Sequence, residues 1–154
     1  MNIVDESFIY LNEDLNSREA ILKKIGKDLK KKNRIESVET FYQDVLSRED
    51  EMTTYMDNGI AIPHCKTDNI LDSTVVLLRN NKKVDWNDED EPTDLVFLLS
   101  IKNTNQKDDQ SHLQVLSRLA QNLMDDDFME IIRHENDIET IYKALKKVEG
   151  GEAS

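Results

Sequence analysis

The sequence predicts an α/β fold: a single layered domain with a central mixed β-sheet flanked by helices on both sides. Apolar residues recur at helical spacing before residue 50 and after residue 110, whereas the middle of the chain carries short β-branched runs typical of strands. A length of 154 residues suits one domain with a buried core better than two. We therefore expect one domain over residues 1–154, ordered from about residue 6 to residue 148.

The first third of the chain predicts one strand followed by two helices. Residues 8–11 form a short apolar strand candidate. Asn16, with Glu19 three residues later, predicts a capped helix start, and the basic residues 30–32 suit its last turn because positive charge complements the helix dipole. A second helix, ending near residues 46–49, is predicted by an apolar stripe of Val38, Phe41, Tyr42 and Val45.

The middle of the chain predicts the strands of the sheet. Residues 59–62 form a short apolar stretch that Pro63 ends, and residues 73–79 form a β-branched run. Val84 and Trp86 alternate with charged residues, which indicates a half-buried or edge strand. Residues 95–99 are apolar throughout and predict a strand buried on both faces, preceded by an acidic turn at 88–94.

The last third returns to helices. Ser111 and Gln114 repeat the capping pattern ahead of an apolar stripe of Leu113, Leu116, Ala120 and Leu123. A short helix is predicted at residues 127–133. A final helix, with Asn136 as its N-cap, is predicted by apolar residues on one face: Ile138, Ile141, Tyr142, Leu145 and Val148.

Charge and composition exclude several classes of function. Lys and Arg number 20 against 32 Asp and Glu, so the net charge is −12, which disfavours binding to nucleic acid or anionic lipid and favours a basic protein partner. The single cysteine, Cys65, cannot form an internal disulfide, which suits a reducing compartment. No run approaches the roughly 20 apolar residues of a membrane span, and the start lacks the pattern of a secretory signal. We expect a cytoplasmic protein without membrane insertion.

Two histidines lie where an α/β fold commonly places a site. His64 follows Pro63 at a strand end, so its ring leaves the strand in a defined direction. His112 lies in the first turn of a predicted helix, where free backbone N–H groups favour anions and a neutral imidazole could donate to a phosphoryl oxygen. A structural role for His64 and a merely exposed position for His112 remain open alternatives. His134, near a helix end, is better explained by the helix dipole.

Other polar residues follow the second predicted helix. Arg48 could bind phosphate oxygens or simply end the helix. Glu49 could hold that guanidinium or be a solvated carboxylate. The hydroxyls of Thr53 and Thr54 could donate to an anion or cap the loop locally.

Three other chemistries find little support. A Cys65 nucleophile would need an oxyanion site that no motif supplies, and a zinc site of His64, Cys65 and His112 would lack a clear fourth ligand. The four glycines never form a phosphate-binding loop of the Walker type. We therefore expect neither a metal nor a cofactor.

Several of these residues together resemble a known family. Arg48 and Glu49, then Thr53, then the stretch 59–65 (GIAIPHC) resemble the type-2 enzyme IIA of the bacterial phosphoenolpyruvate-dependent sugar phosphotransferase system, the fructose/mannitol class. Residues 112–120 (HLQVLSRLA) resemble that family's second histidine region. The order of predicted elements agrees from about residue 6 to residue 148, although the polar stretch 80–94 departs from the family's mixed-sheet pattern.

The resemblance implies a role for each site residue. His64 would accept a phosphoryl group from the carrier HPr and pass it to an enzyme IIB. His112 and Arg48 would bind the phosphoryl oxygens, with Thr53 as a weaker donor and Glu49 orienting Arg48. Such a relay can proceed without a metal or cofactor on the enzyme IIA.

The resemblance thus predicts an enzyme, a phosphotransferase that serves sugar uptake. Fructose is the favoured sugar, and mannitol or galactitol remain open because the sugar binds another polypeptide. The alternative is a free-standing regulatory enzyme IIA of the nitrogen-related type, whose phosphorylation state controls partner proteins. Both functions would use His64 in the same way.

Overall fold

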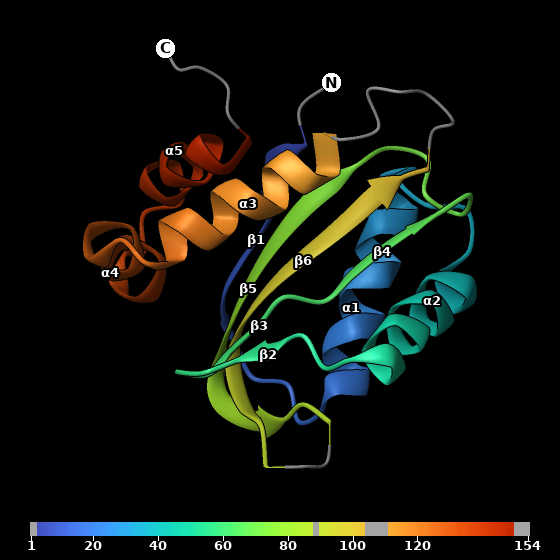
Figure 1. Cartoon of the computed structure of the whole chain (residues 1–154), viewed down its shortest axis with the longest axis horizontal. Helices are drawn as coiled ribbons and strands as arrows, with labels where there is room; N and C mark the ends of the chain where they lie inside the picture. Colours follow the sequence, from blue (N-terminus) through green and yellow to red (C-terminus); the bar gives the residue numbers. More distant parts are fainter. Residues whose placement is uncertain (1–2, 88–89, 104–110, 150–154) are drawn as a thin grey trace.

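A computed structural model describes residues 3–87, 90–103 and 111–149, without the side chains of 111–113 and 149. Two helices cover one face of a β-sheet and three helices cover the other, as the sequence predicts (Figure 1). In chain order the elements are β1 (Val4–Glu13), α1 (Arg18–Lys31), α2 (Val38–Glu51), β2 (Tyr55–Met56), β3 (Ile60–Ala61), β4 (His64–Thr67), β5 (Thr74–Asp85), β6 (Pro92–Lys102), α3 (Ser111–Leu123), α4 (Asp126–His134) and α5 (Ile138–Glu149).

The sheet is mixed, which confirms the predicted fold class. Its strand order is β1-β5-β6-β3-β2, and β4 also pairs with β6. β5 runs antiparallel to β6 and parallel to β1, whereas β3 and β4 both run parallel to β6. β3 and β4 follow one another along the same side of β6, so the chain between them, which contains Pro63, stays close to the sheet.

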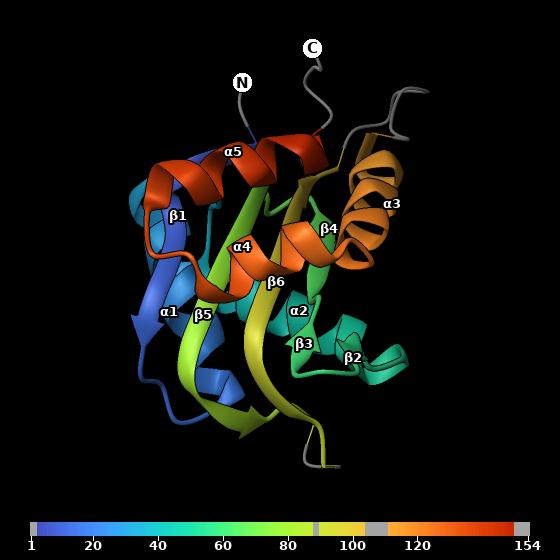
Figure 2. The same cartoon turned by 90° about the vertical axis from the view of Figure 1, so that its left-hand side faces the viewer.

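Two hydrophobic cores lie on the two faces of the sheet. The α3–α5 core packs under α3, α4 and α5, which cover one face in Figure 2, and the α1–α2 core packs under α1 and α2. The predicted doubly buried strand is the centre of β6: Leu95, Phe97 and Leu99 belong to the α3–α5 core, and Val96 and Leu98 to the α1–α2 core. Side-chain alternation along β6 therefore joins both helical layers to one strand.

Two helix caps differ from the prediction. The Oγ atom of Ser17, rather than Asn16, accepts a hydrogen bond from the backbone N–H of Ala20 at 3.0 Å. Asp137, rather than Asn136, accepts from the N–H of Thr140 at 3.2 Å. Ser, Asp and Asn are all good caps. In both cases the asparagine instead accepts a hydrogen bond from a side chain of β5.

Strand boundaries differ more. β1 is longer than the predicted 8–11, and Val84 continues β5 beyond a register irregularity after Arg79 rather than forming a separate edge strand. Val84 and Trp86 are buried, not half-buried. β2 and β4 were not predicted, because two or four residues carry too short a periodic signal. The predicted acidic turn contains residues 88–89, which lie outside the described residues.

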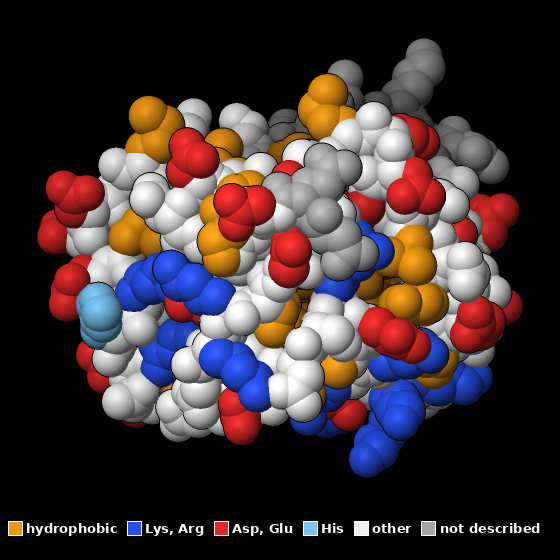
Figure 3. All heavy atoms as spheres, turned by 90° about the horizontal axis from the view of Figure 1, so that it is seen from below, with side chains coloured by type: hydrophobic (Ala, Val, Ile, Leu, Met, Phe, Trp, Pro, Cys, Tyr) orange, Lys and Arg blue, Asp and Glu red, His pale blue; other side chains and the backbone are white. Residues whose placement is uncertain are grey.

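Charge is mixed on the face in Figure 3. Lys and Arg side chains gather beside Asp and Glu there, with apolar side chains between them, so the net charge of −12 does not make this face uniformly acidic. Among the described helices, none is long and apolar enough to cross a membrane.

Candidate functional site

His64 is the first residue of β4, directly after Pro63. It pairs with Leu99 of β6, which belongs to the α3–α5 core, while the next residue, Cys65, is buried in the α1–α2 core. Because side chains alternate along a strand, His64 lies toward the face that α3–α5 cover. Its ring remains half-buried and therefore accessible.

Two hydrogen bonds determine the protonation of the His64 ring. Nε of Arg48 donates to Nε2 of His64 at 3.0 Å, and Nδ1 lies 3.0 Å from the carbonyl oxygen of Ile62. A guanidinium has only donors, so Nε2 must be an unprotonated acceptor. The carbonyl has only acceptors, so Nδ1 carries the proton. The ring is thus a neutral imidazole whose lone pair lies on Nε2 and accepts from Nε of Arg48.

Arg48 reaches this position from the last turn of α2. Its Nη1 donates to the carbonyl oxygen of Met52 at 2.9 Å, at the C-cap of the same helix. That contact satisfies a helix-end carbonyl and fixes the plane of the guanidinium. Within the described part of the chain, Nη2 of Arg48 has no hydrogen-bond partner, so its N–H groups can donate to an anionic ligand.

Glu49 is placed differently from the expectation. Its carboxylate is buried, at 5% exposure, and accepts from the backbone N–H of Thr54 at 3.0 Å and from the Thr54 hydroxyl. The described structure contains no ion pair between Glu49 and Arg48, so Glu49 does not orient the guanidinium directly. It holds the loop that follows α2, because a buried carboxylate must find donors nearby.

Thr53 is in the same loop, and its hydroxyl already has partners. The hydroxyl donates to Oε1 of Glu91 at 2.8 Å and accepts from the backbone N–H of Tyr55 at 3.1 Å. To donate to a phosphoryl group it would have to leave Glu91, so a role for Thr53 at His64 stays a prediction.

His112 is the second residue of α3, in the first helical turn, as predicted. Its side chain lies outside the described residues, so its contact with a phosphoryl group stays a prediction. α3 packs on α4 and α5, on the face of the sheet toward which His64 lies.

Cys65 is unsuited to nucleophilic chemistry. Its side chain is 5% exposed, and burial raises the pKa of its thiol to about 12. Because the thiolate is the nucleophile, a buried thiol with a raised pKa is inert near neutral pH. Across the described residues, no three His, Cys, Asp or Glu side chains form a group that could hold a metal ion.

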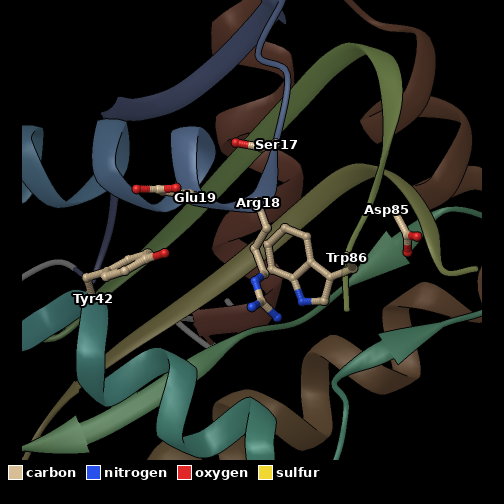
Figure 4. A pocket seen from close by; sticks show the side chains of 6 residues that line it. All are labelled: Ser17, Arg18, Glu19, Tyr42, Asp85 and Trp86. Carbon is tan, nitrogen blue, oxygen red and sulfur yellow. The ribbon is translucent and has the colours of Figure 1, made fainter. Parts of the chain in front are cut away.

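A separate cavity of about 230 Å³ opens near the start of α1 (Figure 4). In that view the guanidinium of Arg18 lies beside the indole of Trp86. The cavity includes none of the predicted site residues; its lining is Ser17, Arg18, Glu19, Tyr42, Asp85 and Trp86.

Sequence reasoning missed two backbone acceptors of the site and one side chain. The carbonyls of Ile62 and Met52 fix the ring and the guanidinium, and every residue has such a carbonyl, so no sequence signal distinguishes them. Asn87 bonds to the loop after α2 from a distant turn, and only the fold brings it there.

Comparison with known proteins gives a consistent result. Residues 2–148 match the family model described as "Phosphoenolpyruvate-dependent sugar phosphotransferase system, EIIA 2". The chain is 32% identical over 116 residues to the fructose-specific EIIA component of the PTS system of Haloferax volcanii, which covers 75% of this chain and 73% of that protein. It is 28% identical over 138 residues to the multiphosphoryl transfer protein of Shigella flexneri, covering 90% of this chain but only 16% of that protein's length.

Solved structures share the fold. The mannitol IIA of Escherichia coli superposes with a TM-score of 0.72 at 25% identity, covering 92% of this chain and 97% of that one. The complex of Escherichia coli enzyme IIA mannitol with phosphorylated enzyme IIB mannitol gives a TM-score of 0.71 at 25% identity, covering 91% and 94%. The nitrogen regulatory protein IIA-Ntr of Neisseria meningitidis gives 0.80 at 24% identity, covering 93% and 96%, which shows a shared fold.

Proposed function

The chain belongs to the EIIA 2 family of the phosphoenolpyruvate-dependent sugar phosphotransferase system, and on that premise we propose that it carries a phosphoryl group on Nε2 of His64. The observation that carries this proposal is the hydrogen-bond pattern of the ring, which leaves the lone pair on Nε2. An imidazole is a nucleophile only through its unprotonated nitrogen. The Ile62 carbonyl keeps the proton on the other nitrogen, so the nucleophile is ready without a general base.

The transfer step is a displacement at phosphorus. The Nε2 lone pair forms the new P–N bond as the bond between phosphorus and the donor's nitrogen breaks, and the electron pair of that bond leaves with the donor. No proton has to move on His64, because Nδ1 already carries one. The Ile62 carbonyl then stabilises the N–H of the phosphorylated ring, whose second nitrogen remains a donor.

Arg48 changes partner during this step. Its Nε covers the lone pair in the resting state and must leave Nε2 when phosphorus approaches. Nη1 stays on the Met52 carbonyl, so the guanidinium keeps an anchor while its remaining donors bind the phosphoryl oxygens. Phosphoryl transfer depends chiefly on positioning and on stabilising charge, which a guanidinium supplies. His112, at the N-terminus of α3, would supply a further donor.

For partners, we propose HPr as the phosphoryl donor and an enzyme IIB as the acceptor, in the cytoplasm, with fructose as the favoured sugar. The fructose-specific relative supports the sugar, and the likeness to an enzyme IIA solved together with a phosphorylated enzyme IIB supports the acceptor. Mannitol and galactitol remain alternatives. The reaction as proposed requires no metal or cofactor on this chain.

A regulatory role is the second candidate. The likeness to IIA-Ntr favours it only at the level of fold, since the identity is 24%. The two functions differ in the fate of the phosphoryl group. A transport component passes the group rapidly to an enzyme IIB, whereas a regulatory one keeps it and changes its affinity for another protein. Transfer from the phosphorylated chain to a purified enzyme IIB therefore separates them.

Intact-mass spectrometry after incubation with phosphoenolpyruvate, enzyme I and HPr tests the proposal. We expect one acid-labile phosphoryl group on the parent chain and none on His64→Ala, whose circular dichroism and melting temperature should match the parent. His134→Ala, at the end of α4, is the matched control and should be phosphorylated normally. Phosphorylation of His64→Ala, or none on the parent with a cognate HPr, would refute the assignment.

A further inference from the structure

Asn87 lies just after β5 and connects three parts of the chain. Its amide nitrogen donates to Oε1 of Glu49 at 3.3 Å, to Oε1 of Glu91 at 2.8 Å and to the Thr53 hydroxyl. Its amide oxygen accepts from Nη1 of Arg18. One side chain therefore ties the turn between β5 and β6 to α1, to α2 and to the loop that follows α2.

That loop, residues 52–54, positions the site arginine. The carbonyl of Met52 accepts from Nη1 of Arg48, but the Met52 side chain is 68% exposed, so apolar burial does not hold the loop in place. Polar contacts hold it instead: Glu49 accepts from the backbone and hydroxyl of Thr54, and Thr53 bonds to Asn87. Asn87 thus bonds to residues on both sides of Met52.

We propose that Asn87 is a positioning residue, which fixes the Met52 carbonyl and through it aims Arg48 at the reacting nitrogen of His64. This inference rests on the proposed function. Arg48 must exchange the imidazole for phosphoryl oxygens while Nη1 keeps one fixed anchor. If the loop moves, the guanidinium loses that anchor and samples orientations that do not meet the phosphoryl group.

Arg18 holds the amide of Asn87 in place by donating to its oxygen. Its guanidinium lies beside the indole of Trp86, which is 1% exposed and cannot easily move (Figure 4). The amide oxygen of Asn87 is thereby held by a packed cation, and its nitrogen is directed at Glu49, Thr53 and Glu91. The amide is suited to this place because it offers an acceptor to the cation and donors to two carboxylates.

The test compares Asn87→Ala with Asn81→Ala, an exposed asparagine of β5. We expect Asn87→Ala to slow phosphoryl acceptance from phosphorylated HPr about fivefold, the effect of losing one well-placed hydrogen bond. Asn81→Ala should equal the parent. In an Arg48→Ala background, Asn87→Ala should cause no further slowing, because its effect passes through Arg48. Equal slowing in both backgrounds, or none in either, would overturn the proposal.

A second pair of variants keeps the test informative if Asn87→Ala is poorly folded. Glu91→Ala removes a carboxylate that Asn87 and Thr53 share, whereas Glu91→Gln retains an oxygen that accepts both bonds. We expect Glu91→Ala to be slowed and Glu91→Gln to recover most of the parent rate. Equal rates for the two variants would contradict a hydrogen-bonding role.

An NMR measurement separates failure of this inference from failure of the proposed function. In Asn87→Ala the ¹⁵N signal of His64 Nε2 should move toward the value of an unbonded imidazole nitrogen, and in Asn81→Ala it should not. If the parent chain accepts no phosphoryl group but this shift occurs, the positioning role stands and the proposed function fails. If phosphorylation is normal and the signal and rate are unchanged, Asn87 has no positioning role.

Discussion

An arginine side chain forms hydrogen bonds at the end of α2 and another at the end of α4, and the two differ in the partners that they bind. At the end of α2, Arg48 bonds to one backbone carbonyl and one neutral imidazole. At the end of α4, Arg79 donates to the carbonyls of Ile132 and Glu135, each at 2.9 Å, and to Oδ1 of Asn136 at 2.6 Å. All three acceptors of Arg79 belong to fixed parts of the fold, whereas the imidazole bound by Arg48 is itself the reactive group.

The difference shows what makes an arginine available for chemistry. Arg133 of α4 pairs with Oδ1 of Asp94 at 2.7 Å and donates to the Asn58 carbonyl, so its hydrogen bonds, like those of Arg79, hold parts of the fold together. A buried or half-buried guanidinium with a full set of partners would incur a desolvation penalty on leaving them. Arg48 can exchange a neutral partner for an anionic one, which strengthens its hydrogen bonds.

The largest effect is expected from removing each of the two arginines by mutation. Arg48→Ala should slow phosphoryl acceptance about 100-fold, because the developing charge on phosphorus loses its guanidinium, with little change in melting temperature. Arg79→Ala should leave the rate unchanged and lower the free energy of unfolding by about 2 kcal/mol, because it leaves helix-end carbonyls unpaired. Stopped-flow transfer assays and urea unfolding measure the two quantities. A loss of stability in Arg48→Ala with an unchanged rate, or a slowed rate in Arg79→Ala with unchanged stability, would contradict the different roles assigned to the two arginines.

The next prediction concerns Gly59, in the turn that contacts Asp94 and Arg133. Its φ is +80°, and an added Cβ would lie 2.7 Å from Oδ1 of Asp94, the partner of Arg133. Gly59→Ala should therefore lower the free energy of unfolding by about 2 kcal/mol. Asn58→Gly, at a neighbouring φ of +68°, is the control and should be neutral or slightly stabilising. Equal unfolding midpoints for parent and Gly59→Ala would show that this turn adapts freely.

A smaller effect is expected at the second histidine. His112→Ala should slow transfer about tenfold by removing one donor to the phosphoryl group, without unfolding the domain. The measurement is the single-turnover rate beside the melting temperature. A lower melting temperature with an unchanged rate would instead show that His112 is structural.

The smallest effect concerns Cys65, next to His64 in the sequence. Burial raises the pKa of its thiol to about 12, so only roughly one thiol in ten thousand is ionised at pH 8. The native protein should therefore react with a thiol reagent far more slowly than the protein in urea, and reactivity should rise as the pH rises toward that value. Rapid labelling of the native chain at pH 8 would show that Cys65 is accessible.

Much of the fold was predictable because it rests on local patterns. The apolar stripes of Val38, Phe41 and Val45, and of Ile141, Leu145 and Val148, predicted helices that the structure confirms. The run 95–99 predicted a doubly buried strand because every one of its side chains is apolar, and the structure confirms this by placing alternate side chains in the two cores. The caps at Asn16 and Asn136 were wrong because side chains of β5 compete for those amides, and competition between distant residues has no local signal.

The sequence alone determined the layered α/β class, the helices and the identity of the candidate residues His64, Arg48 and His112. Only the tertiary structure decided that Arg48 and His64, 16 positions apart, share a hydrogen bond, and that Glu49 holds Thr54 instead of the guanidinium. The physical reason is range. Periodicity and capping act between near neighbours along the chain, whereas the hydrogen bond to Nε2 of His64 comes from a guanidinium that meets the ring only because the fold places β4 beside α2.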